Sequence, residues 1–467
     1  MVILRCTECS ATFKPHPTRY RCGRCGGLLE YVYDYGRLAE RKLPPAFTFW
    51  RYRPWLPEVK RVVSMGEGGT PLHRAERLAE RVGLSHLYIK DETRNPTNSF
   101  RDRCAALMVS NAQDLGYRAI VCATNGNLGA SLAAYCARVG LPCHIVVPRF
   151  IDMGKLAQML IYDADIEEYG ELVDEAIQRA ERLAGETGWY QATAELNPLS
   201  IEAQKTIAFE VAEQMDVPDW IFISMGSGGT LYSVWKGFRE LLAMGRIDEL
   251  PRLVGVQAQG CPSIVDAYLK GRAEPILVEK PYTHALAILV RNPLYGRLAL
   301  RAITESKGEA ISVSDSEILI AEQEIARLEG IFAEPASSAT LAALKRMVKD
   351  GTIDRGDQVV CLVTGSGLKA TDVLQALAKR RKTAILGLEL STKEKILRIL
   401  SEEDTYGYDL WKKLGRTMTK AAVYQHLNEL HTKGLVAAYE RDGRKYFRIT
   451  DRGERVLHAI QEIKALL

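Results

Sequence analysis

The chain has 467 residues, of which 47% are hydrophobic and 26% charged, and 62 basic against 58 acidic side chains leave a formal net charge of +4. This composition excludes a single small module, a disordered chain and a fibrous protein, and the length suffices for about three domains. No apolar run reaches the about eighteen residues of a membrane span, and the first residues lack the apolar core of a secretory signal. We therefore expect a cytoplasmic protein with no membrane partner.

Two CxxC units stand near the N-terminus, Cys6 with Cys9 and Cys22 with Cys25. Each unit offers two thiolates from one turn, and two units complete the tetrahedral coordination of a structural zinc ion. Two disulfides or a redox-active CxxC are the alternatives. We expect a zinc-ribbon-like segment over residues 1–35, too short to fold without such a tie. The other six cysteines stand singly and are expected to be buried thiols: Cys104, Cys122, Cys136, Cys143, Cys261 and Cys361.

Short apolar runs alternate with longer amphipathic segments from about residue 87 to residue 377. A strand over 119–123, a helix over 128–139 and a strand over 144–147 are typical of an α/β domain with parallel strands. Polar, glycine-bearing loops follow three predicted strands, at 124–129 and at two later places, 226–230 and 363–369. The carboxyl ends of parallel strands share one edge of a sheet, so these loops predict a cofactor cleft. In the second loop the backbone N–H groups at a helix start suit a phosphate; its residues are Gly226, Ser227, Gly228, Gly229 and Thr230.

Six motifs follow one another along the chain: Gly66–Leu72, Lys90–Arg103, Gly154–Lys155, Glu202–Thr206, Glu334–Ser337 and Thr364–Lys369. Their order resembles threonine synthase, a family of pyridoxal-phosphate enzymes. The resemblance implies an α/β fold of fold-type II over residues 36–380, with pyridoxal 5'-phosphate between two α/β subdomains and commonly a homodimer. It also implies that Gly226–Thr230 hold the cofactor phosphate, that Asn127 lies beside the pyridine 3′-oxygen, and that Thr364 contacts the pyridine nitrogen. A helix N-cap is the alternative for Asn127, and a turn hydroxyl is the alternative for Thr364.

The catalytic lysine of that family is missing. The family motif reads Ser-Phe-Lys-Asp-Arg, and its lysine forms the Schiff base with the cofactor, whereas this chain has Arg101 at that position. A guanidinium stays protonated and cannot become the neutral amine that a Schiff base requires. Lys90 is the nearest alternative amine in the sequence. Arg101 therefore cannot attach the cofactor covalently, and we expect the cofactor to be bound non-covalently or not at all.

The substrate motif departs from the family as well. Threonine synthases usually carry Asn-Ser-x-Asn-Pro-Tyr-Arg, whose serine and arginine help to hold the phosphate of O-phosphohomoserine. The corresponding stretch, residues 194–200, has Glu195 and Ser200 at those two positions. An acidic side chain replaces a donor and a neutral one replaces a cationic clamp, so a dianionic substrate is expected to be repelled. The alternative is that Arg94 or Arg103 takes over the clamp.

The last part of the chain has a different pattern, which begins after a basic joint at Lys379–Lys382. Three helices are expected at 392–402, 406–414 and 420–433, followed by strands at 435–439 and 445–449 around the turn residues Asp442 and Gly443, and a closing helix from 451. This arrangement over residues 388–467 is a winged helix-turn-helix, and its motifs resemble those of PadR-like transcription regulators.

Residues of this tail suit DNA. On the third helix we expect Lys420, Tyr424, Gln425 and His426 to face a major groove. On the hairpin we expect four basic residues to contact phosphates or a minor groove: Arg441, Arg444, Lys445 and Arg448. Residues 391–467 hold 15 basic and 11 acidic side chains, so the whole net charge of the protein lies in the tail. Protein pairing is the alternative use of such a module.

Two functions remain open from the sequence. One is a threonine-synthase-like lyase with a regulatory tail and doubtful catalysis, because Arg101 replaces the lysine. The other is a catalytically silent regulator that senses an amino acid or pyridoxal phosphate and binds DNA through residues 391–467. Because a winged helix usually reads a palindromic site as two copies, a homodimer is expected in either case.

Overall fold

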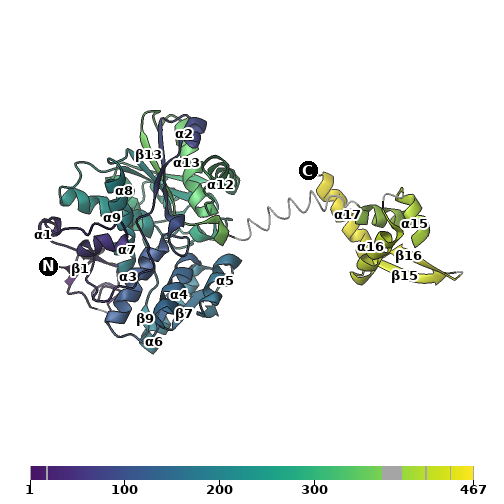
Figure 1. The fold of residues 1–467 in the computed structure, drawn as a ribbon, viewed down its shortest axis with the longest axis horizontal. Helices are drawn as coiled ribbons and strands as arrows, with labels where there is room; N and C mark the ends of the chain where they lie inside the picture. The colour runs from purple at the N-terminus through teal and green to yellow at the C-terminus, as the bar shows by residue number, and fades with distance from the viewer. Residues whose placement is uncertain (1, 17–18, 371–391, 416–417, 442, 466–467) are drawn as a thin grey trace. The chain divides into compact units, whose positions relative to one another are not determined.

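The computed structural model describes residues 2–16, 19–370, 392–415, 418–441 and 443–465. The chain divides into two compact units, Met1–Asp372 and Val373–Leu467 (Figure 1). The basic joint Lys379–Lys382 lies outside the described residues. Within the described residues, no helix is long and apolar enough to cross a membrane.

The first unit begins with a small antiparallel sheet that carries the CxxC units. Its strands are β1 (Ile3–Cys6), β2 (Thr12–Phe13) and β3 (Leu29–Val32), in the order β2-β1-β3. The short helix α1 (Tyr35–Ala39) and the 3₁₀ turn η1 (Phe49–Trp55) follow. This segment is attached to the rest of the unit through polar contacts: the Tyr33 hydroxyl donates to Glu202, and the Tyr232 hydroxyl donates to Glu30 at 2.5 Å.

A six-stranded sheet forms the larger layer of the first unit, in the order β12-β11-β10-β13-β5-β4. All neighbours are parallel except β4 and β5. The strands are β4 (Leu72–Arg74), β5 (His86–Asp91), β10 (Trp220–Ser224), β11 (Arg252–Ala258), β12 (Glu309–Val313) and β13 (Gln358–Val363). The helices of this part are α2 (Glu76–Val82), α8 (Thr206–Gln214), α9 (Gly229–Ala243), α10 (Ser263–Leu269), α11 (Gly296–Glu305), α12 (Asp315–Glu329) and α13 (Pro335–Lys349).

A second sheet of the first unit is wholly parallel, with the order β8-β7-β6-β9. Its strands are β6 (Ile120–Ala123), β7 (Cys143–Val147), β8 (Asp165–Glu168) and β9 (Tyr190–Gln191). Its helices are α3 (Arg101–Asp114), α4 (Asn127–Val139), α5 (Met153–Ile161), α6 (Val173–Thr187) and α7 (Leu199–Gln204). The strand, helix, strand order predicted from residue 119 onward is confirmed. The inner strands are buried on both faces, which explains why they are almost continuously apolar; they are β6, β7, β10, β11 and β13. The edge strand β8 is polar and partly exposed.

The interior of the first unit also confirms the interpretation of the single cysteines. All six lie buried and outside disulfides, as expected for small hydrophobic residues. Separate apolar clusters fill the space on either side of each sheet.

The second unit is a winged helix. A helix over residues 392–402 precedes α15 (Gly407–Lys413) and α16 (Lys420–Thr432), and β15 (Val436–Arg441) pairs with β16 (Arg444–Ile449) as an antiparallel hairpin. The short strand β14 (Thr405–Tyr406) completes the sheet order β14-β16-β15, and α17 (Asp451–Ala465) closes the unit. A core of its own packs the three helices on the hairpin; it includes Ile396, Leu410, Val423, Leu427 and Phe447. Asp442 of the predicted turn lies outside the described residues, and Gly443 has a φ of +67°.

Candidate functional site

A cleft lies where loops that follow β6, β10 and β13 converge. The polar loops at 124–127, at 226–230 and at Thr364 all line it, as predicted from the rule that parallel strands present their carboxyl ends at one edge. The start of α3, the turn after β9 and the start of α13 close its walls, through Phe100, Arg101, Ala194, Glu195, Glu334 and Ala336. The structure therefore brings residues from both sheets to one site.

The loop between β10 and α9 has the features of an anion cradle. Gly228 has a φ of +89°, which favours glycine, and a Cβ there would lie 2.9 Å from the Cβ of Ala299. The loop ends at the N-terminus of the 15-residue helix α9, where backbone N–H groups and the helix dipole favour a negative charge. The hydroxyl oxygen of Ser227 is buried without a hydrogen-bond partner in the described residues. These observations fit a bound phosphate.

Asn127 and Thr364 line the same cleft. The N-cap of α4 is Gly126 and not Asn127, so the capping alternative for Asn127 is wrong. Its Nδ2 donates to both carboxylate oxygens of Glu334, at 3.0 and 3.1 Å, while its buried Oδ1 has no partner among the described residues. The Thr364 hydroxyl is 2.8 Å from that of Ser337, whose oxygen also accepts from the backbone N–H of Gly365. Both side chains are fixed and both line the cleft.

Glu334 is a wall residue that the sequence analysis placed in a motif but not in the site. It is 2% exposed, and the Lys155 ammonium lies 3.2 Å from its carboxylate and 2.7 Å from that of Asp152. Burial lowers the pKa of Lys155, but the carboxylates of Glu334 and Asp152 outweigh it and raise that pKa. The Lys155 ammonium, which does not line the cleft, thus compensates the negative charge of Glu334. The motif Glu334–Ser337 is the sequence signal that could have placed it in the site.

Arg101 is the first residue of α3 and lines the cleft. Its guanidinium lies 4.6 Å from the centre of the Phe100 ring, and no carboxylate of the described residues lies within 4.0 Å of it. No lysine belongs to the described lining of the cleft. Two lysines are buried nearby, Lys155 in the ion pairs above and Lys369, whose Nζ donates to the carbonyl of Thr97 at 2.8 Å. The cleft therefore holds a guanidinium at the position where the resemblance implies an amine.

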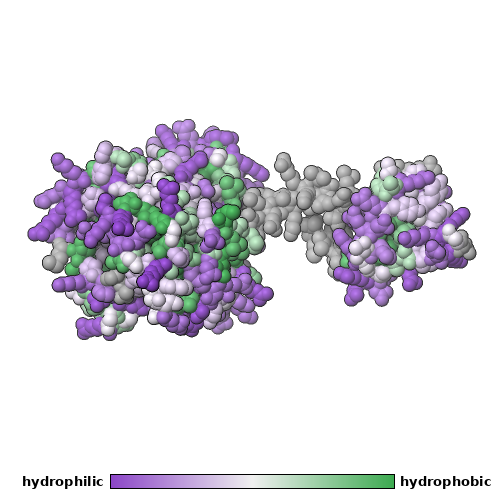
Figure 2. Space-filling view, turned by 60° about the horizontal axis from the view of Figure 1, so that its bottom comes forward, coloured by the Kyte–Doolittle hydropathy of each residue, from purple (hydrophilic) through white to green (hydrophobic). Residues whose placement is uncertain are grey.

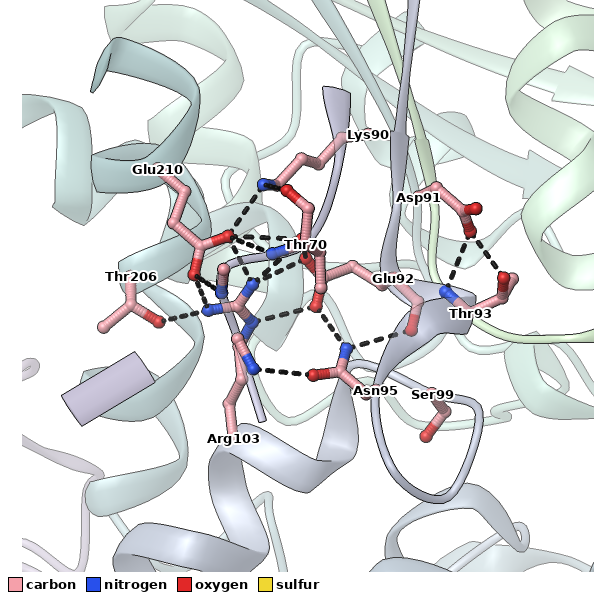
Figure 3. Close-up of polar contacts among 12 residues, drawn as sticks. Thr70, Lys90, Asp91, Glu92, Thr93, Asn95, Ser99, Arg103, Thr206 and Glu210 are labelled. Atoms are coloured by element: carbon pink, nitrogen blue, oxygen red, sulfur yellow. Dashed lines mark hydrogen bonds and ion pairs between the residues drawn. The ribbon is translucent and has the colours of Figure 1, made fainter. Parts of the chain in front are cut away.

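The sequence left Lys90 as an alternative Schiff-base amine and Arg94 or Arg103 as an alternative phosphate clamp. These alternatives are wrong, because none of the three residues lines the cleft. Lys90 is fully buried, and its Nζ donates to Glu210, to the carbonyl of Thr70 and to Gln214. Arg103 is also fully buried and binds Glu92 at 2.7 Å and Glu210 at 2.5 Å; Figure 3 shows this arginine between the two carboxylates. Arg94 points to Asp91 and is largely exposed.

The stretch that replaces the substrate motif carries no positive charge. Ser200 accepts a hydrogen bond from Gln204 at 2.9 Å, and the Oε1 of Gln204 accepts one from Thr230 at 2.8 Å. These three side chains are hydrogen-bonded to one another, and they line the cleft together with Glu195. The arginine position of the family is thus occupied by a neutral, internally bonded network.

The four N-terminal cysteines converge as a zinc site requires. Their Sγ atoms all lie within 4.8 Å of one another, with 3.5 Å between Cys6 and Cys25 and 3.6 Å between Cys9 and Cys22. Thiolates at about 2.3 Å from one tetrahedral ion are separated by roughly 3.8 Å. Backbone N–H groups donate to sulfur in both knuckles, from Glu8 to Cys6 and from Arg24 to Cys22. The donor set fits zinc.

The second unit exposes most of the side chains predicted to face DNA. Lys420, Tyr424 and Gln425 are exposed on α16, whereas His426 is only half-exposed and its buried Nδ1 has no partner among the described residues. The four basic residues of the hairpin are exposed, and Arg444 and Arg448 lie over the rings of Tyr406 and Tyr439 at 5.2 and 5.9 Å. The face of this unit seen in Figure 2 is mainly hydrophilic.

Comparison with known proteins defines the class. The family of pyridoxal-phosphate dependent enzymes matches residues 63–365, and the PadR-like family of transcriptional regulators matches residues 396–459. Maize serine racemase shares the fold over 68% of this chain and 93% of its own, with a TM-score of 0.57 and 21% identity. A threonine deaminase from Solanum lycopersicum aligns over 64% of this chain and 79% of its own, with a TM-score of 0.54 and 22% identity. The fold is that of fold-type II pyridoxal-phosphate enzymes, with a winged helix added.

The nearer relatives define the group within that class. The threonine synthase of Methanocaldococcus jannaschii is 41% identical over 79% of this chain and 94% of its own length. That of Methanosarcina acetivorans is 40% identical over 79% of this chain and 92% of its own length. The chain belongs to the threonine synthase family of pyridoxal-phosphate dependent enzymes and carries a C-terminal PadR-like domain.

Proposed function

We propose that this protein is a ligand-sensing regulator that binds DNA, built on a threonine synthase fold that binds its ligand without turnover. The observation that supports this most is Arg101 in the cleft, at the position of the Schiff-base lysine, with no lysine in the described lining. Arginine cannot supply the neutral amine, and the buried lysines nearby are engaged in ion pairs or backbone hydrogen bonds.

The cofactor cradle supports binding of pyridoxal 5'-phosphate without a covalent bond. When bound in an enzyme, this cofactor supplies an electron sink for carbanions. Here Gly226–Thr230 and the start of α9 would hold its phosphate, and Asn127 and Thr364 would contact its ring. The unpartnered Ser227 hydroxyl and Asn127 Oδ1, judged among the described residues, favour a polar ligand in this place. Arg101 would bind an anionic group of the cofactor or of a second ligand.

The PadR-like domain supports binding of DNA. The exposed stripe of Lys420, Tyr424 and Gln425 on α16 would enter a major groove, and His426 would lie at its border. The exposed arginines and lysine of the hairpin would contact phosphates. A homodimer would place two such helices on a palindromic site. The protein would act in the cytoplasm, and a zinc ion bound by the four cysteines would stabilise the N-terminal segment.

A second candidate function, a threonine-synthase-like lyase, is favoured by the 41% identity over nearly the whole length of the archaeal relative. Phosphate release from O-phosphohomoserine distinguishes the two. We expect no release above background from the full-length protein with pyridoxal phosphate. Robust turnover by the unchanged protein would overturn the regulator proposal.

Binding to DNA is tested separately with duplexes selected from a random library, using the full-length protein. We expect the double variant Arg444→Ala, Lys445→Ala to weaken binding about tenfold or more and to reduce its salt dependence. Lys395→Ala, an exposed charge on the first helix of the same unit, is the matched control. Equal binding by all three proteins would remove the hairpin from the DNA interface.

A further inference from the structure

Two half-buried side chains of opposite charge line the cleft, Arg101 at the start of α3 and Glu195 on the turn after β9. Neither has an ion-pair partner within 4.0 Å among the described residues. Glu334, the other charged residue of the lining, is already bound by Lys155 and Asn127. Within the described lining, the cleft therefore offers a ligand one free cation and one free anion.

The turn that carries Glu195 is held in place by its neighbour Asn197. The Asn197 side chain donates to the carbonyl of Gln191 at 2.8 Å and to the Tyr190 hydroxyl at 3.0 Å, and its Oδ1 accepts from the backbone N–H of Leu199. Its own backbone N–H donates to Thr193 at 2.9 Å. Glu195 thus stands on a fixed support, as a ligand-binding group requires.

The electrostatics of Glu195 favour a cationic partner. Burial raises the pKa of its carboxyl group, and the nearby Arg101 guanidinium opposes that effect without cancelling it. A positively charged group of a ligand would stabilise the carboxylate further. The same carboxylate would repel a phosphate, and the neutral Ser200, Gln204 and Thr230 network offers no cation to offset the repulsion.

We propose that the cleft recognises an unphosphorylated amino-acid zwitterion, with Arg101 binding its carboxylate and Glu195 binding its ammonium group. A guanidinium and a carboxylate that come from different elements of the lining match the two charges of such a ligand. This inference rests on the proposed function, because the ligand is bound and not consumed.

Titration calorimetry of the full-length protein tests the inference, with each standard L-amino acid and L-homoserine as ligand and with O-phospho-L-homoserine for comparison. We expect at least one unphosphorylated amino acid to bind more tightly than the phosphorylated one. For that amino acid, Glu195→Gln and Arg101→Gln should each weaken binding about tenfold or more, since each leaves one ligand charge unpaired. Glu195→Asp should retain part of the affinity, and Glu168→Gln, an exposed glutamate at the end of β8, should retain all of it.

Analogues separate the two charges of the ligand. The same compound without its α-amino group should lose affinity for the unchanged protein but show no further loss in Glu195→Gln. The compound without its α-carboxyl group should behave in the same way toward Arg101→Gln. Circular dichroism of each variant verifies folding.

Three outcomes would overturn the inference: no amino acid binds at millimolar concentration, O-phospho-L-homoserine binds most tightly, or Glu195→Gln binds like the unchanged protein. Each is distinguishable from failure of the proposed function. That failure is turnover of O-phosphohomoserine, measured by phosphate release in the same preparations.

Discussion

Two arginines on the first turn of α3 have opposite surroundings. Arg103 faces the interior, is 0% exposed and is bound by the carboxylates of Glu92 and Glu210, whereas Arg101 faces the cleft and has no carboxylate within 4.0 Å among the described residues. Although burial raises the pKa of Glu210, Arg103 and Lys90 lower it to about 2. One arginine thus completes the protein's own ion network, and the other is the one that we propose to bind a ligand.

The largest effect is expected from Arg103→Met. The substitution leaves the carboxylates of Glu92 and Glu210 buried with too few cations, and removal of one partner of a buried pair costs about 3–5 kcal/mol. The melting temperature of the first unit should fall steeply, or the protein should fail to fold. A melting curve like that of the unchanged protein would show that the network in Figure 3 contributes little to stability.

Removal of the zinc site should have the next largest effect. Cys22→Ser leaves three of the four thiolates, so the protein should lose its zinc, measured by atomic absorption as one ion per chain in the unchanged protein. Because Glu30 and Tyr33 join this segment to Tyr232 and Glu202, the melting temperature of the first unit should fall as well. Cys261→Ser, at a single buried cysteine, should keep the zinc. Full zinc content in Cys22→Ser would contradict the proposed ligand set.

Glu322 is a buried carboxyl group that has no ion pair with a cation among the described residues, in contrast to Glu210. Burial, helped by Glu334, raises its pKa from 4.5 to about 7. The folded protein therefore binds more protons than the unfolded chain between these values, and stability attributable to Glu322 is lost as the pH rises from about 4.5 to 7. Glu322→Gln should gain about 2–3 kcal/mol over the unchanged protein at pH 8 and much less at pH 5. Denaturant unfolding at both pH values measures this difference, and a gain independent of pH would contradict it.

The smallest effect on stability is expected from Arg101→Met. Since Arg101 has no ion pair in the described residues, its loss should change stability by about 0.5 kcal/mol or less. The ligand affinity should nevertheless fall, because the cation of the cleft is removed. Thermal unfolding without ligand measures the change in stability, and the shift of the melting temperature on adding ligand measures the change in affinity. A loss of stability as large as that in Arg103→Met would show that Arg101 serves the fold.

The sequence predicted those parts of the fold and site that depend on local patterns. The CxxC spacing, the glycine loop at 226–230 and the hairpin around Gly443 are local signals, and each lies where it was expected. Arg101 was singled out because one position of an ordered motif had changed its chemistry. These features need no knowledge of distant contacts.

Contacts between distant segments were not predictable in this way. The sequence could not exclude Lys90 as the Schiff-base amine, nor Arg94 or Arg103 as the phosphate clamp. The distance between residues along the sequence does not say which side of a strand or helix faces the cleft. Glu334 joins the wall through two partners that lie far from it in the sequence, Asn127 and Lys155. The amide of Asn127 points to this glutamate, which a helix-capping pattern could not indicate. Only the packing of the two sheets brings these groups together.

If the cleft binds its cofactor as we propose, no covalent bond joins the cofactor to the protein. The direct measurement is the intact mass of the full-length protein after incubation with pyridoxal phosphate and reduction with borohydride. We expect no phosphopyridoxyl group on Lys155 or Lys369, the two buried lysines near the cleft, in the unchanged protein. In the Arg101→Lys variant we expect one such group on the lysine introduced by that substitution, located by peptide mapping. A phosphopyridoxyl group on Lys155 or Lys369 of the unchanged protein would contradict non-covalent binding.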